Sequence, residues 1–415
     1  METRKRILVF VPEFPVLTET FIERELAKLE ERGNVDLTVF SLARGNGGVS
    51  EILENKIVYG RLRPKDFFLS LPYIFSNLPR LRKIFFDSKK EAGELENKKS
   101  RESNPNYLKK SYTFFKSILY SIKFSKYKPD FILAHFLSTP STIVMYASRI
   151  LRIPYGISAH AKDVMVTGEF IREKVQTSKF ITICNKNAYE YVLEKAKGLD
   201  TSKIFLKYHG VDVPKIIKKV ENKDFKSEKP LILAVGRLVE KKGLIYLIES
   251  ASLLKDRGLG FQVGIIGSGP LFENLKKEIN SRSLQNDVKI IGDNKGLSNE
   301  ETLLYLKSAR LFVFPGIRTD EGDVDGVANV LMEAGIFRVP VISTDAGGVG
   351  EIIVNKVTGL VVNQRDSATM AEKIEYLLKN EDEARKYGNN LYNKVLEKFD
   401  LNTNIIELEN LLLQN

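Results

Sequence analysis

Short continuous apolar runs alternate with longer segments of helical periodicity along most of the chain. In the first half the runs Ile7–Val11, Val35–Phe40, Phe131–Ala134 and Tyr155–Ser158 have the length of buried parallel strands. A helical pattern over Thr142–Leu151 separates the last two of them. Regular alternation of this kind predicts an α/β domain built on a parallel sheet.

Local signals mark where helices and loops begin in this first half. Thr20 and Glu23 have the spacing of a capping box, so a helix is expected to begin at Thr20 and to end at Gly33. The tract 87–106 has almost no apolar residues and is expected to be a mobile loop or insertion.

A second series of strands and helices begins after a polar connection at Val213–Lys229. Its expected elements, in chain order, are Leu231–Val235, a helix over Leu244–Leu254, Phe261–Ile266, a helix over Leu271–Ile279, Val288–Ile291, a helix over Glu300–Ala309, Leu311–Phe314, a helix from Val330 and Val339–Ile342. Two doubly wound domains are therefore predicted, with ligands at the carboxyl ends of their strands and in the cleft between them.

The length and the few metal-binding residue types limit the classes of protein. A chain of 415 residues exceeds what one hydrophobic core usually supports. The single cysteine, Cys184, excludes a disulfide framework and a cysteine-based metal cluster. His135, His160 and His209 show no ligand-type spacing, so no structural zinc site is expected. No apolar run is long enough to span a bilayer, and the first apolar run is too short for a signal peptide. We therefore expect a cytoplasmic protein.

The formal charge of +11 is concentrated in one part of the chain. Residues 61–130 contain 17 Lys and Arg against 7 Asp and Glu, and aromatic residues are interleaved with them. Basic and aromatic residues on helical segments are typical of an anionic membrane surface, of nucleic-acid binding, or of an ordinary solvated face. The pattern alone leaves these three interpretations open.

A basic turn follows the first strand of the second series. Gly236 and Arg237 come directly after Leu231–Val235, and Lys242 follows shortly before a helix. A glycine at a strand end lets the backbone approach a ligand, while a guanidinium and an ammonium group neutralise phosphate oxygens. This turn is therefore a candidate diphosphate site, and a basic surface turn is the alternative.

A glycine-rich turn at Gly267 follows the next strand. The sequence IIGSGP is reminiscent of a dinucleotide fingerprint, but Phe272 occupies the third glycine position. The turn therefore favours a tight bend beside a nucleotide, or a purely structural bend, over a nicotinamide cofactor.

The segment from Phe314 to Glu351 carries most of the candidate chemistry. Asp325 lies in an acidic loop, and Glu333 lies eight residues later in a helix for which Asn329 is the expected N-cap. Two carboxylates in this arrangement can contact different hydroxyls of one ligand, and free backbone N–H groups at the helix start can meet phosphate. The pair Gly347-Gly348 after the next strand permits close backbone approach. The two loops together suit a sugar diphosphate.

These motifs, in this order, resemble the retaining glycosyltransferases of family 4, which have the GT-B architecture of two doubly wound Rossmann-like domains facing across a cleft. The resemblance rests on GRLVEKKGLIYLIES, IIGSGPLFENL, DGVANVLMEAG and PVISTDAGGVGEII in the second half. In the first half, FPVLTETFIERE, AHF, GISAHAKDV and HGVDV resemble the polysaccharide and colanic-acid-type subgroup. The resemblance covers most of the chain.

The resemblance implies roles for individual residues in binding the donor. Arg237 and Lys242 correspond to the pair that binds the donor diphosphate, and Glu333 corresponds to the residue that holds the ribose hydroxyls. Asp325 stands where the family has a glutamate that contacts the transferred sugar. Further donor contacts are expected from Gly267, Val327, Asn329, Gly347 and Gly348. Gly335 and Arg338 depart from the methionine and glycine that are usual there.

The histidines and the domain boundaries are also interpreted through the resemblance. His160 corresponds to the histidine that faces the donor sugar, and His135 to a second position with a base or acceptor-orienting role; with Asp325 they form the expected catalytic set. No metal or other cofactor is expected. The implied domains are an acceptor-binding domain over residues 1–213, a donor-binding domain over 214–395, and a final helix, 396–415, that packs back on the first.

The expected reaction is therefore transfer of a sugar from a UDP- or GDP-sugar to a saccharide or polyprenyl-linked saccharide in cell-surface polysaccharide biosynthesis, with the anomeric configuration retained. The basic region 61–130 suggests attachment to the inner face of the cell membrane rather than binding to nucleic acid. A sugar-nucleotide epimerase or a phosphorylase with the same architecture is the nearest alternative, followed by a nucleic-acid-binding protein.

Overall fold

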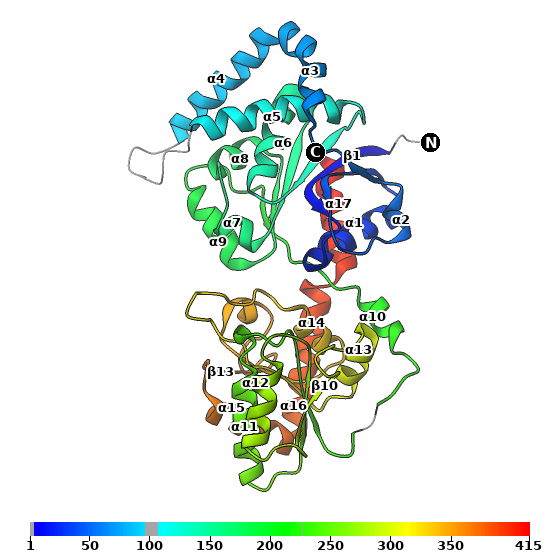
Figure 1. Cartoon of the computed structure of the whole chain (residues 1–415), viewed down its shortest axis with the longest axis vertical. Coiled ribbons are helices and arrows are strands. Elements are labelled where there is room, and N and C mark those ends of the chain that lie inside the picture. Colours follow the sequence, from blue (N-terminus) through cyan, green and yellow to red (C-terminus); the bar gives the residue numbers. More distant parts are fainter. Residues whose placement is uncertain (1–3, 96–106, 226) are drawn as a thin grey trace. The chain divides into compact units, whose positions relative to one another are not determined.

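The computed structural model describes residues 4–95, 107–225 and 227–415, and these form two compact units (Figure 1). Unit 1 contains the chain up to His209 together with Asn404–Asn415, and unit 2 contains Gly210–Thr403. The sequence placed the corresponding boundaries after residues 213 and 395. Each unit has one parallel sheet covered by helices, which confirms the expected α/β class.

The sheet of unit 1 has seven parallel strands in the order β3-β2-β1-β4-β5-β6-β7. The strands are β1 (Lys5–Phe14), β2 (Val35–Arg44), β3 (Ile57–Tyr59), β4 (Phe131–His135), β5 (Tyr155–Ala159), β6 (Ile181–Ile183) and β7 (Ile204–Leu206). The strand order reverses between β1 and β4. Ligands of doubly wound sheets bind at the carboxyl edge beside such a reversal.

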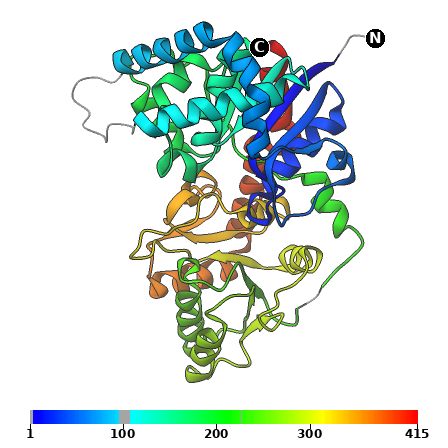
Figure 2. The same cartoon turned by 45° about the horizontal axis from the view of Figure 1, so that its top comes forward.

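The described helices of unit 1 are α1 (Thr20–Arg32), α2 (Glu51–Glu54), α3 (Pro64–Ser76), α4 (Leu78–Leu95), α5 (Tyr107–Ser125), α6 (Thr139–Leu151), α7 (Ala161–Met165), α8 (Ile171–Thr177), α9 (Lys186–Lys195) and α17 (Leu401–Gln414). Helices α3 and α4 form an outlying pair beside α5 (Figures 1 and 2). None of the described helices is long and apolar enough to cross a membrane.

Helix α1 begins at Thr20 as expected, but the predicted capping box is wrong. The N-cap of α1 is Glu19, and no side chain caps the helix. The Glu23 carboxylate instead accepts a hydrogen bond from the backbone N–H of Ser50, the residue before α2. Gly33 ends α1 as expected, in the left-handed conformation.

The polar tract 87–106 is also helical where it is described. Helix α4 continues to Leu95, so the expected loop is wrong for residues 87–95, and residues 96–106 lie outside the described part of the chain. Lysine, glutamate and alanine favour helix without any apolar periodicity, which is why the pattern of apolar positions did not reveal it.

Helix α17 returns the end of the chain to unit 1. The Glu409 carboxylate is buried and accepts hydrogen bonds from Arg32 and from Asn34. The Asn404 amide donates to the carbonyl of Tyr208. These bonds attach α17 to α1 and to the segment that ends unit 1.

The sheet of unit 2 has six parallel strands in the order β10-β9-β8-β11-β12-β13. The strands are β8 (Leu231–Val235), β9 (Gln262–Ile266), β10 (Val288–Ile291), β11 (Leu311–Phe314), β12 (Val341–Thr344) and β13 (Leu360–Val362). The helices are α10 (Val213–Lys219), α11 (Leu244–Asp256), α12 (Phe272–Ser281), α13 (Asn299–Ser308), α14 (Asn329–Ile336), α15 (Ser367–Lys379) and α16 (Glu381–Lys398), with short 3-10 turns at Glu240–Lys242 and Gly347–Glu351. The order reverses between β8 and β11.

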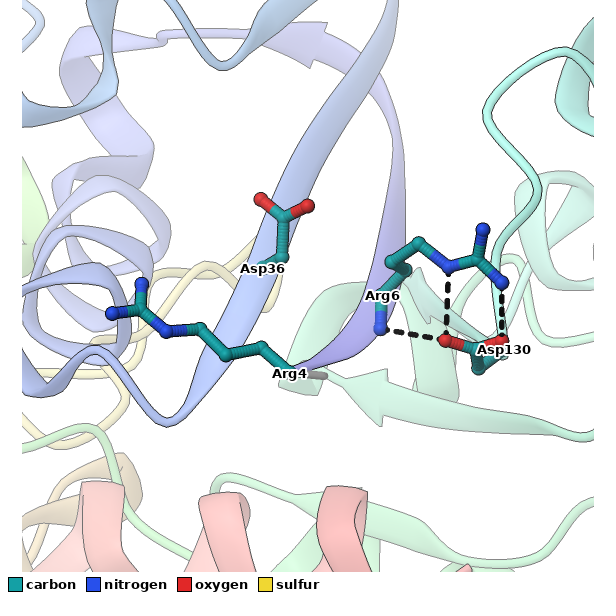
Figure 3. Close-up of a pocket in the computed structure, with 4 residues that line it drawn as sticks. All are labelled: Arg4, Arg6, Asp36 and Asp130. Atoms are coloured by element: carbon teal, nitrogen blue, oxygen red, sulfur yellow. Dashed lines mark hydrogen bonds and ion pairs between the residues drawn. The ribbon is translucent and has the colours of Figure 1, made fainter. Parts of the chain in front are cut away.

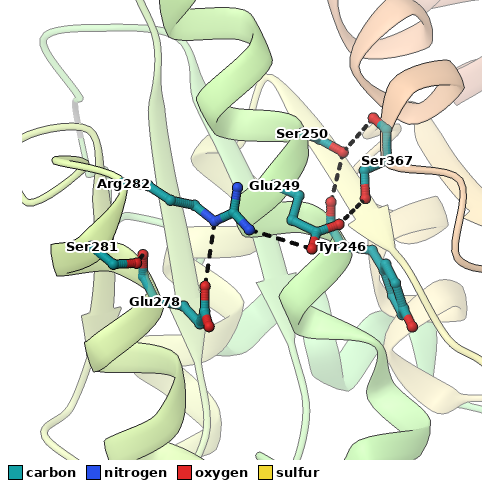
Figure 4. Close-up of polar contacts among 7 residues, drawn as sticks. All are labelled: Tyr246, Glu249, Ser250, Glu278, Ser281, Arg282 and Ser367. Atoms are coloured by element: carbon teal, nitrogen blue, oxygen red, sulfur yellow. Dashed lines mark hydrogen bonds and ion pairs between the residues drawn. The ribbon is translucent and has the colours of Figure 1, made fainter.

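A polar network fixes α11 against its neighbours α12 and α15 (Figure 4). The Glu249 carboxylate accepts hydrogen bonds from Ser367 at 2.5 Å and from Arg282 at 3.4 Å. The Ser250 hydroxyl donates to the backbone of Ser367 at 2.8 Å. Arg282, the residue directly after α12, also pairs with Glu278 on that helix. Helix α11, which follows the basic turn after β8, is thereby bonded to α15 and to the end of α12.

Gly335 and Arg338, the two residues that depart from the family pattern, lie where α14 meets α16. A β-carbon on Gly335 would be 2.7 Å from Cγ2 of Val395, closer than real contacts allow. Arg338 adopts φ +56°, and its guanidinium lies 3.8 Å from the centre of the Tyr392 ring. The absence of a side chain at Gly335 thus lets the two helices approach, and Arg338 is held by an aromatic face.

Candidate donor site and histidine cluster

Two glycine turns meet at the carboxyl edge of unit 2. Gly236 follows β8 and Gly267 follows the adjacent β9, and the Gly236 N–H donates to the carbonyl of Ile266 at 2.9 Å. A β-carbon on Gly267 would be 1.9 Å from the carbonyl oxygen of Gly236. The glycine at 267 is therefore required for the packing of the two turns.

An ion pair crosses the reversal of strand order in unit 2. Lys242, in the turn after β8, lies with its Nζ 2.7 Å from Oδ2 of Asp325, in the loop after β11. The stem of Lys242 runs over Gly236, and its ammonium lies 4.9 Å from the centre of the Phe314 ring. The neighbouring Lys241 lies closer to Asp323, at 3.0 Å, than to Asp325, at 3.6 Å. Two of the predicted donor-site residues are thus in direct contact.

The glycine pair after β12 packs on the same acidic loop. Gly347 has φ +63°, and a β-carbon there would be 2.0 Å from the carbonyl oxygen of Asp325. The Gly348 N–H donates to that oxygen at 3.1 Å, and a β-carbon on Gly348 would be 2.8 Å from the nitrogen of Val327. Asp325 and Val327 from one predicted motif, and Gly347 and Gly348 from another, therefore form one cluster with Lys242.

The remaining predicted donor residues flank this cluster in sequence. Arg237 is exposed beside Gly236, and no ion pair with it occurs among the described residues. Glu333 lies one turn into α14 and is half-buried. Asn329 is the first residue of α14, and Ala328 in extended conformation precedes it as the N-cap, so the expected capping role of Asn329 is wrong.

Histidines that are distant in sequence meet at the carboxyl edge of unit 1. His135 ends β4 and His160 follows β5, and both are buried. Nδ1 of His135 lies 3.4 Å from Nε2 of His160, and the two rings are nearly parallel. Nδ1 of His160 lies 3.0 Å from Nε2 of His209. The lack of ligand-type spacing in the sequence did not reveal this row, because only the neighbouring strands of the sheet bring the histidines together.

The row of histidines ends on a buried carboxylate that the sequence pattern did not reveal. Oε1 of Glu25, on α1, lies 3.0 Å from Nδ1 of His209. Phe21, one turn earlier on α1, stacks on the His209 ring at 3.9 Å between centroids. The signal that could have found Glu25 is its place on the buried face of α1, three residues after Ile22, although the sequence does not name its partner. Its role follows only from its contacts.

Burial and neighbouring charges set the protonation of this row. Burial lowers the pKa of His135 to about 4 and that of His160 well below its ordinary value. Burial also opposes a charge on His209, but Cys184 and the Glu25 carboxylate outweigh it and raise the pKa of His209 to about 9. The pKa of Glu25 is held far below its ordinary value, against burial, by Lys207 and His209.

A buried acid and a buried base fix the loops that carry His135 and His160. The Asp163 carboxylate accepts hydrogen bonds from the backbone N–H groups of His160, at 2.8 Å, and Leu137. Burial raises the pKa of Asp163 to about 6, although those hydrogen bonds oppose the shift. The fully buried Lys174 ammonium donates to the carbonyls of Leu137 and Ser138. Both histidine loops are therefore held by groups that cannot move without losing partners.

Cys184 joins the histidines as a third kind of donor. It follows β6 and is a free, half-buried thiol. One nitrogen of His160, one nitrogen of His209 and the Cys184 sulfur all lie within 4.8 Å of one another. The sequence spacing of these residues gave no sign of this cluster.

A charged pocket lies at the opposite edge of the unit 1 sheet (Figure 3). It is lined by Arg4, Arg6, Asp36 and Asp130, and the Arg6 guanidinium forms a two-pronged ion pair with Asp130. These residues lie at the amino ends of β1, β2 and β4. The pocket is therefore not part of the histidine cluster, which lies at the carboxyl ends.

The second half of the chain is similar to a known protein family. Residues 215–394 match the model of the family described as glycosyl transferases group 1. We call this matched range the group 1 domain. This group 1 domain coincides with most of unit 2 and contains the whole cluster around Lys242 and Asp325.

Individual relatives support the same assignment. The chain is 34% identical over 176 residues to the amylovoran biosynthesis glycosyltransferase AmsK of Erwinia amylovora, which is 42% of either protein. It is 32% identical over 143 residues to the putative colanic acid biosynthesis glycosyltransferase WcaL of Escherichia coli, 34% of either protein. The matches thus span less than half of the length of these relatives. They agree with the expected polysaccharide subgroup.

The fold extends the likeness over the whole chain. The structure of Anabaena HepE in complex with UDP has a TM-score of 0.64 and 16% identity, and covers 99% of this chain and all of that one. At this identity the likeness concerns the fold alone. It confirms the expected GT-B class of two Rossmann-like domains, of which the group 1 domain is the second.

Proposed function

We propose that the chain is a retaining glycosyltransferase that takes its sugar from a nucleotide diphosphate sugar bound to the group 1 domain. The observation that carries this proposal is the Lys242–Asp325 ion pair at the reversal between β8 and β11. A reversal of strand order is where doubly wound sheets bind nucleotides. The pair places a cation for phosphate and a carboxylate for a sugar hydroxyl in the same spot.

The cluster suggests a division of roles on the donor. Lys242 exchanges Asp325 for the diphosphate, and the exposed Arg237 adds a second cation to the leaving group. The Gly347-Gly348 backbone approaches the same phosphates, and Asp325 turns to the transferred sugar. Glu333 accepts hydrogen bonds from the ribose. These cations perform the task for which other transferases use a metal ion, so no metal is assigned to the diphosphate.

The histidines supply the acceptor side of the proposal. Nε2 of His135 is buried and has no hydrogen-bond partner among the described residues. A buried ring nitrogen without a partner is costly, and an acceptor hydroxyl would satisfy it. His135 is therefore proposed to orient the acceptor, and His160, with Nε2 at 3.4 Å from Nδ1 of His135, to fix the His135 ring.

The donor nucleotide is proposed to be UDP or GDP. The HepE structure contains UDP, and the fold of this chain is similar to it. A panel of UDP-, GDP-, ADP- and CDP-sugars in a thermal-shift assay tests the choice. We expect one or two members to raise the Tm of the wild-type protein.

The same assay tests the ribose assignment. Glu333→Ala is expected to lose the nucleotide-dependent rise in Tm, because a carboxylate bonded to ribose hydroxyls contributes about 1.5–3 kcal/mol. Glu372→Ala, an exposed glutamate on α15, is the matched control and should keep the full rise. An undiminished rise in Glu333→Ala would overturn the assignment of Glu333 to the ribose.

The acceptor is proposed to be a lipid-linked saccharide at the inner face of the cell membrane. Helices α3 and α4 expose large apolar side chains, including Phe68 at 66%, Leu69 at 73% and Phe75 at 70%. Exposed cations accompany them on the same segment: Arg61, Arg63, Lys65, Arg82 and Lys83. Apolar side chains among cations on an outlying helix pair suit an anionic bilayer surface.

Flotation with anionic vesicles at low salt tests this surface. The wild-type protein is expected to float, and the triple variant Phe68→Ser, Leu69→Ser, Phe75→Ser is expected to stay in solution. The double variant Val354→Ser, Val357→Ser removes exposed apolar side chains from unit 2 and should still float. Equal flotation of all three proteins would show that the exposed apolar side chains of α3 do not attach the protein to the vesicles.

A further inference from the structure

We propose that His160, Cys184 and His209 bind one thiophilic divalent cation, for which Zn²⁺ is the best match. One donor atom of each residue lies within 4.8 Å of the other two. The residues follow β5, β6 and β7, which are neighbours in the sheet, so their carboxyl ends present the three side chains together. The site shares no residue with the cluster around Lys242 and Asp325 in unit 2.

The donor set determines the kind of cation. Two imidazole nitrogens and one thiolate are ligands that Zn²⁺ takes in tetrahedral sites, where a water or substrate atom fills the fourth position. Hard cations such as Mg²⁺ require oxygen ligands, and none of the three residues offers one. The facing nitrogens, Nδ1 of His160 and Nε2 of His209, are 3.0 Å apart, which is close to the separation of two ligands on one small ion.

The surrounding groups orient both imidazoles for this role. The outer nitrogen of His209, Nδ1, lies 3.0 Å from the Glu25 carboxylate. The outer nitrogen of His160, Nε2, lies 3.4 Å from Nδ1 of His135. Ligating histidines in metal sites almost always donate the outer N–H to a carboxylate, a backbone carbonyl or a water, and Glu25 provides that carboxylate for His209. The stacked Phe21 ring further restricts the rotation of His209.

Two charged groups face the cluster. The Glu25 carboxylate, 3.0 Å from Nδ1 of His209, favours a divalent ion. The buried Lys207 ammonium, which faces that carboxylate, opposes the ion.

Cobalt binding to the full chain tests the proposal directly. The protein is freed of metals with a chelator, titrated with Co²⁺ alone, and followed by its absorbance. Cys184 is the only cysteine of the chain, so a thiolate-to-cobalt charge-transfer band can come from no other residue. We expect that band to saturate at one Co²⁺ per chain and to disappear when Zn²⁺ is added. Binding without the band, or a band that does not saturate at one equivalent, would overturn the proposal.

Variants then separate ligands from neighbours. Cys184→Ser is expected to lose the band, and His209→Asn to lose both the band and stoichiometric binding. Glu25→Gln should retain the band with an affinity about 10–100-fold lower, because only the orientation of His209 is weakened. His135→Asn removes a histidine of the same row that does not ligate; it should retain the band at one equivalent, with an affinity lowered no more than in Glu25→Gln, because His135 only positions His160. Loss of the band in His135→Asn but not in His209→Asn would contradict the ligand assignment.

The outcome is independent of the proposed transfer reaction. Each measurement uses the metal and the protein alone, so failure of the metal site leaves the nucleotide-dependent rise in Tm unaffected. Conversely, an absence of nucleotide binding leaves the cobalt spectrum unaffected. Circular dichroism of each variant shows whether it is folded, and the wild-type band by itself decides the proposal if a variant is not.

Discussion

Replacing Lys242 by methionine is expected to lower kcat/KM for sugar transfer by about 10²–10³-fold. A preorganised cation at the leaving group stabilises charge that develops only in the transition state, and loss of one such group costs about 2.7–4 kcal/mol. Lys242 is preorganised because Gly236 leaves room for its stem and Asp325 holds its ammonium at 2.7 Å. Methionine keeps most of the stem but removes the charge.

Lys241→Met is the matched control for this measurement. Lys241 is the adjacent residue with the same charge, but it pairs mainly with the exposed Asp323. A loss of activity below about tenfold is expected, in line with the small contribution of exposed ion pairs. Turnover of the nucleotide sugar that stabilises the wild-type protein provides the assay. Equal losses for the two variants would mean that general positive charge, and not Lys242, acts on the diphosphate.

Replacing Gly347 by alanine is expected to abolish the rise in Tm that the donor nucleotide produces. The residue has φ +63°, where an L side chain costs about 1–2 kcal/mol. The new β-carbon would also lie 2.0 Å from the carbonyl oxygen of Asp325, so the acidic loop has to move. Movement of that loop separates Asp325 from Lys242 and from the Gly348 N–H, and the donor site loses its shape.

Gly350→Ala, in the same 3-10 turn, provides the comparison. No atom lies within 4 Å of a β-carbon at Gly350, and its backbone does not require the left-handed region. We expect Gly350→Ala to keep the full nucleotide-dependent rise. Binding that survives in Gly347→Ala would show that the contact of the glycine turn with Asp325 is not needed for the donor.

Apolar runs predicted the longer strands, most of which are buried on both faces, but missed the three-residue strands β3, β6, β7 and β13. The runs Leu231–Val235, Val288–Ile291 and Leu311–Phe314 were predicted with the bounds that the structure has. Continuous apolar runs between turn residues are typical of strands in parallel sheets, and three residues are too few for such a run to be recognised. The other errors fell on polar signals, at the N-caps of α1 and α14 and in the tract that extends α4, where the same residues suit several local structures.

The residues of the donor cluster could be predicted from sequence motifs, but the contacts among them could not. The sequence placed Lys242, Asp325 and Gly347 after three different strands, and the carboxyl ends of parallel strands meet at one edge. That Lys242 pairs with Asp325, and that Gly347 packs on the Asp325 carbonyl, follows from the order β8-β11-β12 in the sheet. A strand order is a property of long-range pairing, and apolar periodicity carries no information about it.

The sequence by itself determined the class of fold, the two-domain arrangement and the residues that suit a nucleotide sugar, because these depend on local patterns that repeat along the chain. Only the tertiary structure decided which of those residues touch. It brought His135, His160 and His209 into one row, added the buried Glu25 that ends it, and set Cys184 beside it. Residues separated by up to 184 positions become neighbours there, since parallel strands joined through helices align their ends regardless of their distance in sequence.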